Sequence, residues 1–211
     1  MFKINYMRLV CVAKCVICFL SLVSFGFGSS ELKSTFLMQQ ETQWLIQALE
    51  KAHYTKVSID ELNSTKCINS YLQKLDKQKL YFTQNEVNDF CNRYSPTLKT
   101  LVKQGNLLPG FEIYKAYKTN AINRLNWALK WLDEDLKFDG NISYNINRDE
   151  KRWDIGEDQL ISSWKNLVKH EVLSDIIFNI DVNSSDIFIN SNELTETLEQ
   201  SKDRVKKRYE R

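Results

Sequence analysis

Glycine and proline are scarce in this sequence, with six glycines and two prolines among 211 residues. Gly26 and Gly28 fall in the apolar N-terminal segment, so four glycines and two prolines serve the rest of the chain. An all-β protein needs many tight turns, which these residue types supply. Their shortage excludes such a fold, and the 43% of hydrophobic residues argues against a disordered chain. We therefore expect a mostly α-helical protein with little or no β-structure.

Acidic residues are missing from the first 30 positions, although the whole chain has 27 acidic and 29 basic side chains. Lys3 and Arg8 precede an apolar run at residues 9–27 that one lysine interrupts. This order is typical of a secretory signal peptide, which we expect at residues 1–28, and it predicts a periplasmic or otherwise exported protein. The alternative is an uncleaved anchor that stays in the membrane.

No excess of one charge remains once residues 1–28 are set aside. Three basic side chains leave with that segment and no acid does, so the remainder carries 26 − 27 = −1. Proteins that bind nucleic acid usually present a basic surface. We therefore expect one domain at residues 31–211 that has no nucleic-acid partner and meets a membrane only through an uncleaved signal segment.

Two amphipathic helices are predicted within residues 53–94. Apolar side chains recur there twice with the spacing i, i+3, i+4, i+7, at Ile68, Tyr71, Leu72 and Leu75 and again at Val87, Phe90, Cys91 and Tyr94. Thr83 and Glu86 form the pattern T-x-x-E, a capping box that starts the second helix. Neither helix can bury its stripe alone, so we expect the two to pack face to face.

The longest predicted helix spans residues 109–136 and has two apolar stripes, of which the second carries Trp127 and Trp131. A helix apolar over so wide an arc is expected to be central and contacted from more than one side. Six or seven helices in all are predicted around it; the others include 36–54, 157–178 and a last helix from 193, with a polar loop at 179–190. Residues 137–156 are expected to form a long ordered connection pinned by Trp153, with a short strand or extended segment around Ile142, Tyr144 and Ile146.

Catalytic and metal-binding patterns are few. Ser162 and Lys165 fit the pattern S-x-x-K, but the companion motifs of penicillin-binding enzymes are absent. His170-Glu171 begins H-E-x-x-H, and Ser174 stands where the second histidine belongs. A calcium-loop-like start at residues 135–140 has a lysine at a ligand position. We expect no catalytic residue, no cofactor and no metal site.

Cys67 and Cys91 are the only cysteines after the apolar segment. They lie on the two consecutive helices of residues 53–94, and an exported protein meets an oxidising environment. One interpretation is a disulfide between them, worth about 3 kcal/mol in the chain-entropy model. The other is a pair of small buried thiols, because Cys91 belongs to an apolar stripe while Cys67 lies one position off its own.

An ordered set of short motifs across residues 40–211 resembles the N-terminal helical domain of the periplasmic tail-specific proteases, also called C-terminal processing peptidases. The matching positions are His53-Tyr54, Tyr71-Leu72, Leu75-Asp76, Tyr81-Phe82, Val87, Phe90, Gly110-Phe111, Ile113-Tyr114, Arg124, Phe138-Asp139, Trp164-Lys165 and Arg208-Tyr209. The resemblance implies a helical scaffold and adaptor-binding surface of a serine endopeptidase that degrades proteins from apolar C-terminal tails. The family's serine–lysine dyad and PDZ module lie downstream of this region, so we expect the chain to be inactive alone.

The resemblance also implies a protein partner, either a protease and PDZ portion in cis or in trans, or a periplasmic adaptor. Candidate partner-binding residues are Trp127, Trp131, Val205 and Tyr209, although tryptophans are most often core or interface anchors. Two other functions stay open. One is a free-standing exported helical interaction protein with no protease link, and the other is a truncated or split fragment of the full protease.

Overall fold

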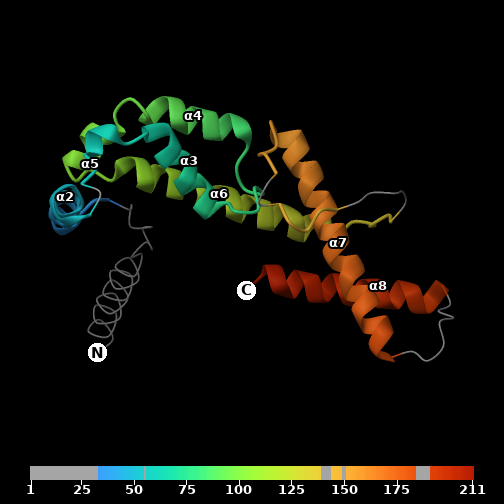
Figure 1. The fold of residues 1–211 in the computed structure, drawn as a ribbon. Coiled ribbons are helices and arrows are strands. Elements are labelled where there is room, and N and C mark those ends of the chain that lie inside the picture. The colour runs from blue at the N-terminus through green and yellow to red at the C-terminus, as the bar shows by residue number, and fades with distance from the viewer. Residues whose placement is uncertain (1–32, 55, 139–143, 149–150, 184–190) are drawn as a thin grey trace, which may run out of the picture. The chain divides into compact units, whose positions relative to one another are not determined.

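The computed structural model describes residues 33–54, 56–138, 144–148, 151–183 and 191–211. The predicted signal peptide and residues 184–190 lie outside this part of the chain, as does Ile142 of the expected extended segment. Seven α-helices and one short 3₁₀ helix make up the described residues, which contain no strand. They are α2 (Phe36–Ala52), η1 (Ile59–Glu61), α3 (Ser64–Leu75), α4 (Gln84–Tyr94), α5 (Leu98–Lys103), α6 (Leu108–Trp131), α7 (Glu157–Asn183) and α8 (Ser191–Tyr209) (Figure 1). The mostly α fold is confirmed.

The α3–α4 pair forms as expected. The capping box is present, because Glu86 N donates to Thr83 Oγ1 at 3.2 Å and Thr83 N donates to Glu86 Oε2 at 2.8 Å. The two helices pack against each other and bury their stripes in a first hydrophobic cluster, which also takes in residues of α6. Its buried members are Ile68, Leu72, Phe82, Val87, Phe90, Tyr94, Leu98, Ile113 and Trp153.

A second hydrophobic cluster lies where α6, α7 and α8 meet. Its buried members are Leu80, Ala128, Leu132, Leu136, Leu160, Trp164, Val168, Val172, Ile176 and Val205. Helix α6 contributes Ile113 to the first cluster and Ala128 to the second, and it contacts α3, α7 and α8. The prediction that this helix is central and touched from several sides is therefore confirmed, and residues 34–211 form one unit with two apolar clusters.

A buried carboxylate ties the turn after α3 to the connection before α7. Asp76 is 1% exposed. Its carboxylate accepts hydrogen bonds from three consecutive backbone amides, those of residues 80–82, at 2.8 to 3.1 Å. It also accepts one from Trp153 Nε1 at 3.0 Å. The expectation that Trp153 pins the 137–156 connection is confirmed, and Asp76 is the group that holds it.

Arg148 strengthens the same junction, since it is 4% exposed and donates to the carbonyl oxygens of Gln78 and Lys79 at 2.9 and 3.3 Å. Lys79 has a positive φ of 54° in this turn. A turn whose carbonyl oxygens accept hydrogen bonds from a buried side chain about 70 residues away is held in one conformation. The connection therefore fixes where α7 begins.

Two expected helix ends differ from the structure. The long central helix ends at Trp131 and not at 136, while α7 continues to Asn183 through part of the expected loop at 179–190. The polar residues of this segment suggested a loop, but they continue the helix instead. None of the described helices is both long and apolar enough to cross a membrane.

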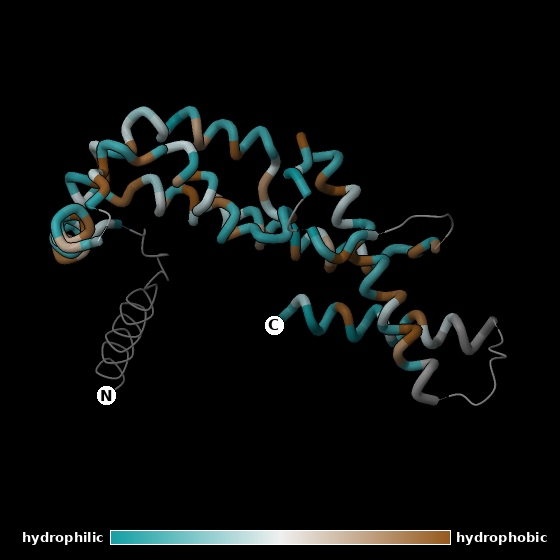
Figure 2. The backbone as a smooth tube through the Cα atoms, in the orientation of Figure 1, coloured by the Kyte–Doolittle hydropathy of each residue, from teal (hydrophilic) through white to brown (hydrophobic). Residues whose placement is uncertain are grey.

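Helix α2 forms at the expected place, with Thr35 as its N-cap, but its apolar stripe faces outward. Ile46 is its one buried residue and packs on the side of α5, which α2 contacts. Trp44 is 71% exposed and Leu45 53%. Hydrophobic residues on α2 are visible in Figure 2, where the helix is seen almost along its axis.

Candidate functional site

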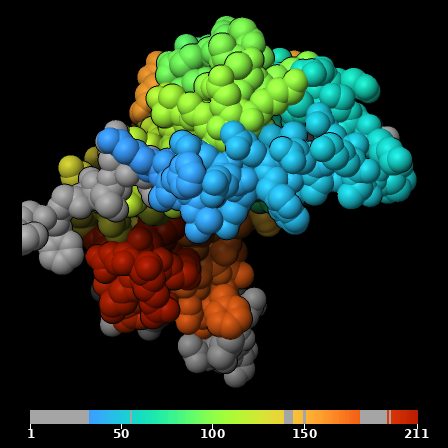
Figure 3. Space-filling view, turned by 90° about the vertical axis from the view of Figure 1, so that its left-hand side faces the viewer, coloured from blue at the N-terminus to red at the C-terminus, as the bar shows by residue number. Residues whose placement is uncertain are grey.

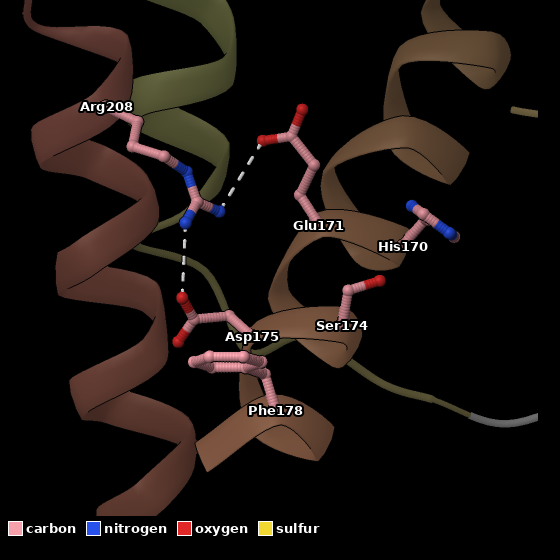
Figure 4. A pocket seen from close by; sticks show the side chains of 6 residues that line it. All are labelled: His170, Glu171, Ser174, Asp175, Phe178 and Arg208. Carbon is pink, nitrogen blue, oxygen red and sulfur yellow. Dashed lines mark hydrogen bonds and ion pairs between the residues drawn. The ribbon is translucent and has the colours of Figure 1, made fainter.

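An open pocket of about 380 Å³ lies between α7 and α8 (Figure 4). Five of its lining residues come from two turns of α7 and the sixth from the end of α8: His170, Glu171, Ser174, Asp175, Phe178 and Arg208. Arg208 faces Glu171 and Asp175, and the ring of Phe178, which is 70% exposed, is drawn next to the Asp175 side chain in Figure 4.

The charges in this pocket are paired with one another. Arg208 Nη1 lies 3.1 Å from Asp175 Oδ1, and Arg208 Nη2 lies 3.9 Å from Glu171 Oε2. Arg204 Nε donates to the other Asp175 oxygen at 2.8 Å. Burial tends to raise the pKa of Asp175, but the hydrogen bonds from Arg204, Ser201 and Arg208 and the arginine charge outweigh it, so the pKa is lowered. These contacts hold α8 against α7, and the two arginines neutralise the two carboxylates at the pocket.

No catalytic or metal-binding arrangement occurs at this pocket. The His170 ring lies 5.0 Å from the Tyr144 ring, centroid to centroid, which is the spacing of a packing contact. No group of three or more candidate metal ligands is present within the described ranges.

Trp127 and Trp131 lie one turn apart on α6 and stack on each other. Their ring centroids are 5.6 Å apart with an interplanar angle of 13°. Both side chains are half-buried and pack against the α6–α7–α8 cluster. Lys165 Nζ of α7 lies 5.9 Å from the centroid of the Trp131 ring, within the range of a cation–π contact. The two rings therefore contact the hydrophobic core on one side and remain partly exposed to solvent on the other.

The two other candidate partner-binding residues differ in exposure. Val205 is completely buried, so its side chain belongs to the α6–α7–α8 cluster and is not on the surface of this structure. Tyr209 is half-buried, with its ring 6.4 Å from that of Trp164. Burial raises the pKa of Tyr209, and the nearby Glu171 charge raises it further. The phenol therefore stays neutral at any physiological pH.

Ser162 and Lys165 of the S-x-x-K pattern are both exposed. The neighbouring Ser163 is buried and has more partners, since its Oγ donates to Asp154 Oδ2 at 2.6 Å and accepts from Lys151 Nζ at 3.4 Å. Lys151 Nζ is itself 3.2 Å from the Asp154 carboxylate. A serine nucleophile needs a neutral base that takes its proton. Here the lysine donates, so the cluster joins the start of α7 to the connection.

Sequence reasoning missed three groups of residues: this serine cluster, the Asp76 junction and the α7–α8 pocket. The Asp76 junction and the pocket pair residues that are distant in the sequence, as in the 33-residue separation of Asp175 and Arg208. The serine cluster spans 12 residues, from Lys151 in the connection to Ser163 in α7. A usable signal existed only for Asp76, an acid directly after an amphipathic stripe and just before three apolar residues.

Cys67 and Cys91 are free thiols in the structure, Cys67 exposed and Cys91 half-buried. Cys91 Sγ donates to Asn69 Oδ1 of α3 at 3.4 Å. Burial raises the pKa of Cys91. The disulfide between them stays a prediction.

Comparisons with known proteins point in one direction. Residues 45–211 match the family described as "Tail specific protease N-terminal domain". A curated tail-specific protease of Haemophilus influenzae is similar to this chain, with 25% identity over 136 residues. That alignment covers 64% of this chain and 20% of the relative, so the match spans about a fifth of the relative's length.

Proposed function

Because this chain belongs to the tail-specific protease N-terminal domain family, we propose that it is a non-catalytic helical scaffold that binds another polypeptide. The observation that carries the proposal is the extent of the match. It covers residues 45–211, nearly the whole of the unit formed by residues 34–211. The partner is the protease and PDZ portion of a tail-specific protease, or an adaptor that presents substrates to it. The location is the periplasm, in keeping with the basic and apolar N-terminal segment.

The internal organisation supports a scaffold. The turn after α3 and the connection before α7 are held together by Asp76, Trp153 and Arg148, all of which are almost completely buried. Such long-range hydrogen bonds between buried groups favour one fixed arrangement of helices over a mobile one. A fixed arrangement is useful to a domain that positions other modules.

The Trp127–Trp131 pair supports a polypeptide partner. Stacked, half-buried aromatic rings are typical anchors at protein interfaces, because they bury much area at little cost in side-chain entropy. Lys165 beside the ring offers a charge at the edge of the apolar patch. Tyr209, at the end of α8, is the second candidate contact.

Binding to a separately produced protease tests the proposal directly. The purified chain is titrated with the Haemophilus influenzae relative from which the matching N-terminal part has been deleted, and affinity is measured by calorimetry. We expect binding, and we expect the complex but not the isolated chain to cleave a substrate with an apolar C-terminal tail.

Trp131→Ala tests the proposed surface, and Ile122→Ala is its matched control. Ile122 is also on α6 and is 48% exposed, but it belongs to neither hydrophobic cluster. An anchoring tryptophan commonly accounts for about 2 kcal/mol, so Trp131→Ala should weaken binding about thirtyfold. Circular dichroism must show that both variants are folded.

Three outcomes contradict the proposal. If a folded Trp131→Ala variant binds as tightly as the wild type, the tryptophan pair is core and another surface binds. If the wild type binds no tail-specific protease at all, the chain is a free-standing interaction protein. Peptidase activity of the isolated chain that Ser162→Ala abolishes would overturn the non-catalytic role.

A further inference from the structure

Helix α2 carries an apolar stripe that the rest of the described chain leaves uncovered. Large hydrophobic side chains recur on one side of it at the spacing of a helix face: Leu37 is 62% exposed, Trp44 71%, Leu45 53% and Leu49 48%. The buried residue Ile46 lies on the opposite side of α2, and α2 contacts α5. Figure 3 shows α2 lying across the face turned to the viewer. Four large apolar side chains on one face of one helix are more than scattered surface hydrophobics.

A single carboxylate lies inside this stripe. At 100° per residue, Glu41 falls between Leu37 and Leu45 in angular position, near the middle of the apolar arc. It is exposed and makes no ion pair with another described residue. Whatever covers the stripe must therefore bring a cation to Glu41, since burying an unpaired carboxylate is costly.

A second copy of α2 supplies that cation when two chains pair through this helix. Two α2 helices packed antiparallel around a twofold axis near residue 46 bring Glu41 of one opposite Lys51 of the other, twice by symmetry. The register also places Trp44 opposite Ala48, a large side chain against a small one. Lys51 is exposed and lies at the edge of the stripe. Charge and size thus complement each other in one arrangement.

We propose that the α2 face, defined by Leu37, Glu41, Trp44, Leu45, Ala48, Leu49 and Lys51, joins two copies of this chain in an antiparallel, twofold-symmetric dimer. The helix has 17 residues and is about 25 Å long at 1.5 Å per residue. One helix pair of this length is small beside a standard interface of about 1,600 Å². The dimer is therefore concentration-dependent, and each exposed apolar residue at its centre matters.

Sedimentation equilibrium of the whole chain, in the form that cells produce, tests the proposal. The wild type is expected to change from monomer to dimer with rising concentration. Trp44→Ala should raise the dimer dissociation constant at least about tenfold, because each dimer loses two central anchors. Ile177→Ala is the matched control, as Ile177 is 51% exposed on α7, and it should leave the constant unchanged.

Charge exchange distinguishes this arrangement from any other association. Glu41→Lys and Lys51→Glu should each raise the dissociation constant about tenfold, because each turns two attractive contacts into two repulsive ones. The double variant E41K/K51E restores both pairs and should return to the wild-type value. All these positions are exposed, so the variants keep the fold, which circular dichroism checks.

The proposal is overturned if the wild type is monomeric at every concentration, which is the result expected when another protein occupies the face. It is also overturned if the single charge variants associate like the wild type, or if E41K/K51E fails to recover. None of these results depends on the protease-binding experiment, so the two proposals fail or survive separately.

Discussion

Asp76 gives the sharpest test of how this fold is held together. Its carboxylate serves four buried donors, three of them backbone amides, and Trp153 supplies the fourth. Asp76→Ala leaves all four without their acceptor. A buried donor that loses its partner costs about 1–3 kcal/mol. Since a water can enter the space left by the carboxylate and satisfy part of the loss, we expect about 4 kcal/mol in total.

The four donors are divided unequally between the two carboxylate oxygens. This division determines how much stability each substitution of Asp76 removes. Oδ2 accepts from Tyr81 N, Phe82 N and Trp153 Nε1, while Oδ1 accepts from Leu80 N alone. In the Asp76→Asn variant the amide oxygen can take the place of Oδ2 and accept the same three hydrogen bonds. Its NH₂ group then faces the backbone amide of Leu80. We expect it to cost about 2 kcal/mol, half as much as the alanine.

Urea unfolding followed by circular dichroism measures these differences, because the free energy of unfolding falls linearly with urea. A total stability of about 5–15 kcal/mol makes a loss of 4 kcal/mol easy to detect. Trp153→Phe is the companion variant, which removes a donor and leaves no polar group unpaired. It should cost less than Asp76→Ala. A loss below about 1 kcal/mol for Asp76→Ala would refute the assignment of Asp76 as the junction of the two parts.

Four further predictions concern other parts of the chain. Gly105→Ala should destabilise by more than about 1 kcal/mol in urea unfolding, since its φ is 73° and an added Cβ would lie 2.4 Å from a backbone oxygen of α2. Gly110→Ala should stabilise α6 by about 0.5–1 kcal/mol, because an added Cβ at Gly110 would lie in open space. If the Gly105 and Gly110 variants change the free energy of unfolding equally, this explanation of the two glycines is wrong. Arg124 of α6 forms an ion pair with Glu157, and its hydrogen bonds lower the pKa of the Glu157 carboxyl group. The stability from this pair is therefore present above the carboxyl pKa of the unfolded chain and is lost as the pH falls through the pKa of the folded state. Glu157→Gln should therefore lose less stability than the wild type between neutral pH and about pH 3. Mass analysis of the unreduced chain should show two hydrogens missing if Cys67 and Cys91 are bonded; two alkylated thiols, with exposed Cys67 reacting first, would exclude the bond.

Local patterns were enough to predict most helices of this protein. The capping box at Thr83 and Glu86 and the stripes of α3 and α4 are signals within one or two turns, and each appears in the structure as expected. The wide apolar arc of α6 likewise indicated a central helix. The ordered motifs across residues 40–211 indicated the family that the comparison finds over residues 45–211.

Only the tertiary structure decided what covers each apolar face. Periodicity shows that a face is apolar, but the buried state of Val205 and the exposed state of Trp44 depend on which helix comes to lie against each. The same holds for polar groups. Asp76 and Trp153 are 77 residues apart, and Asp175 and Arg208 are 33 apart, so no local pattern could pair them. Hydrogen bonds and ion pairs between such distant residues form only after the helices have packed, because packing brings their atoms within bonding distance.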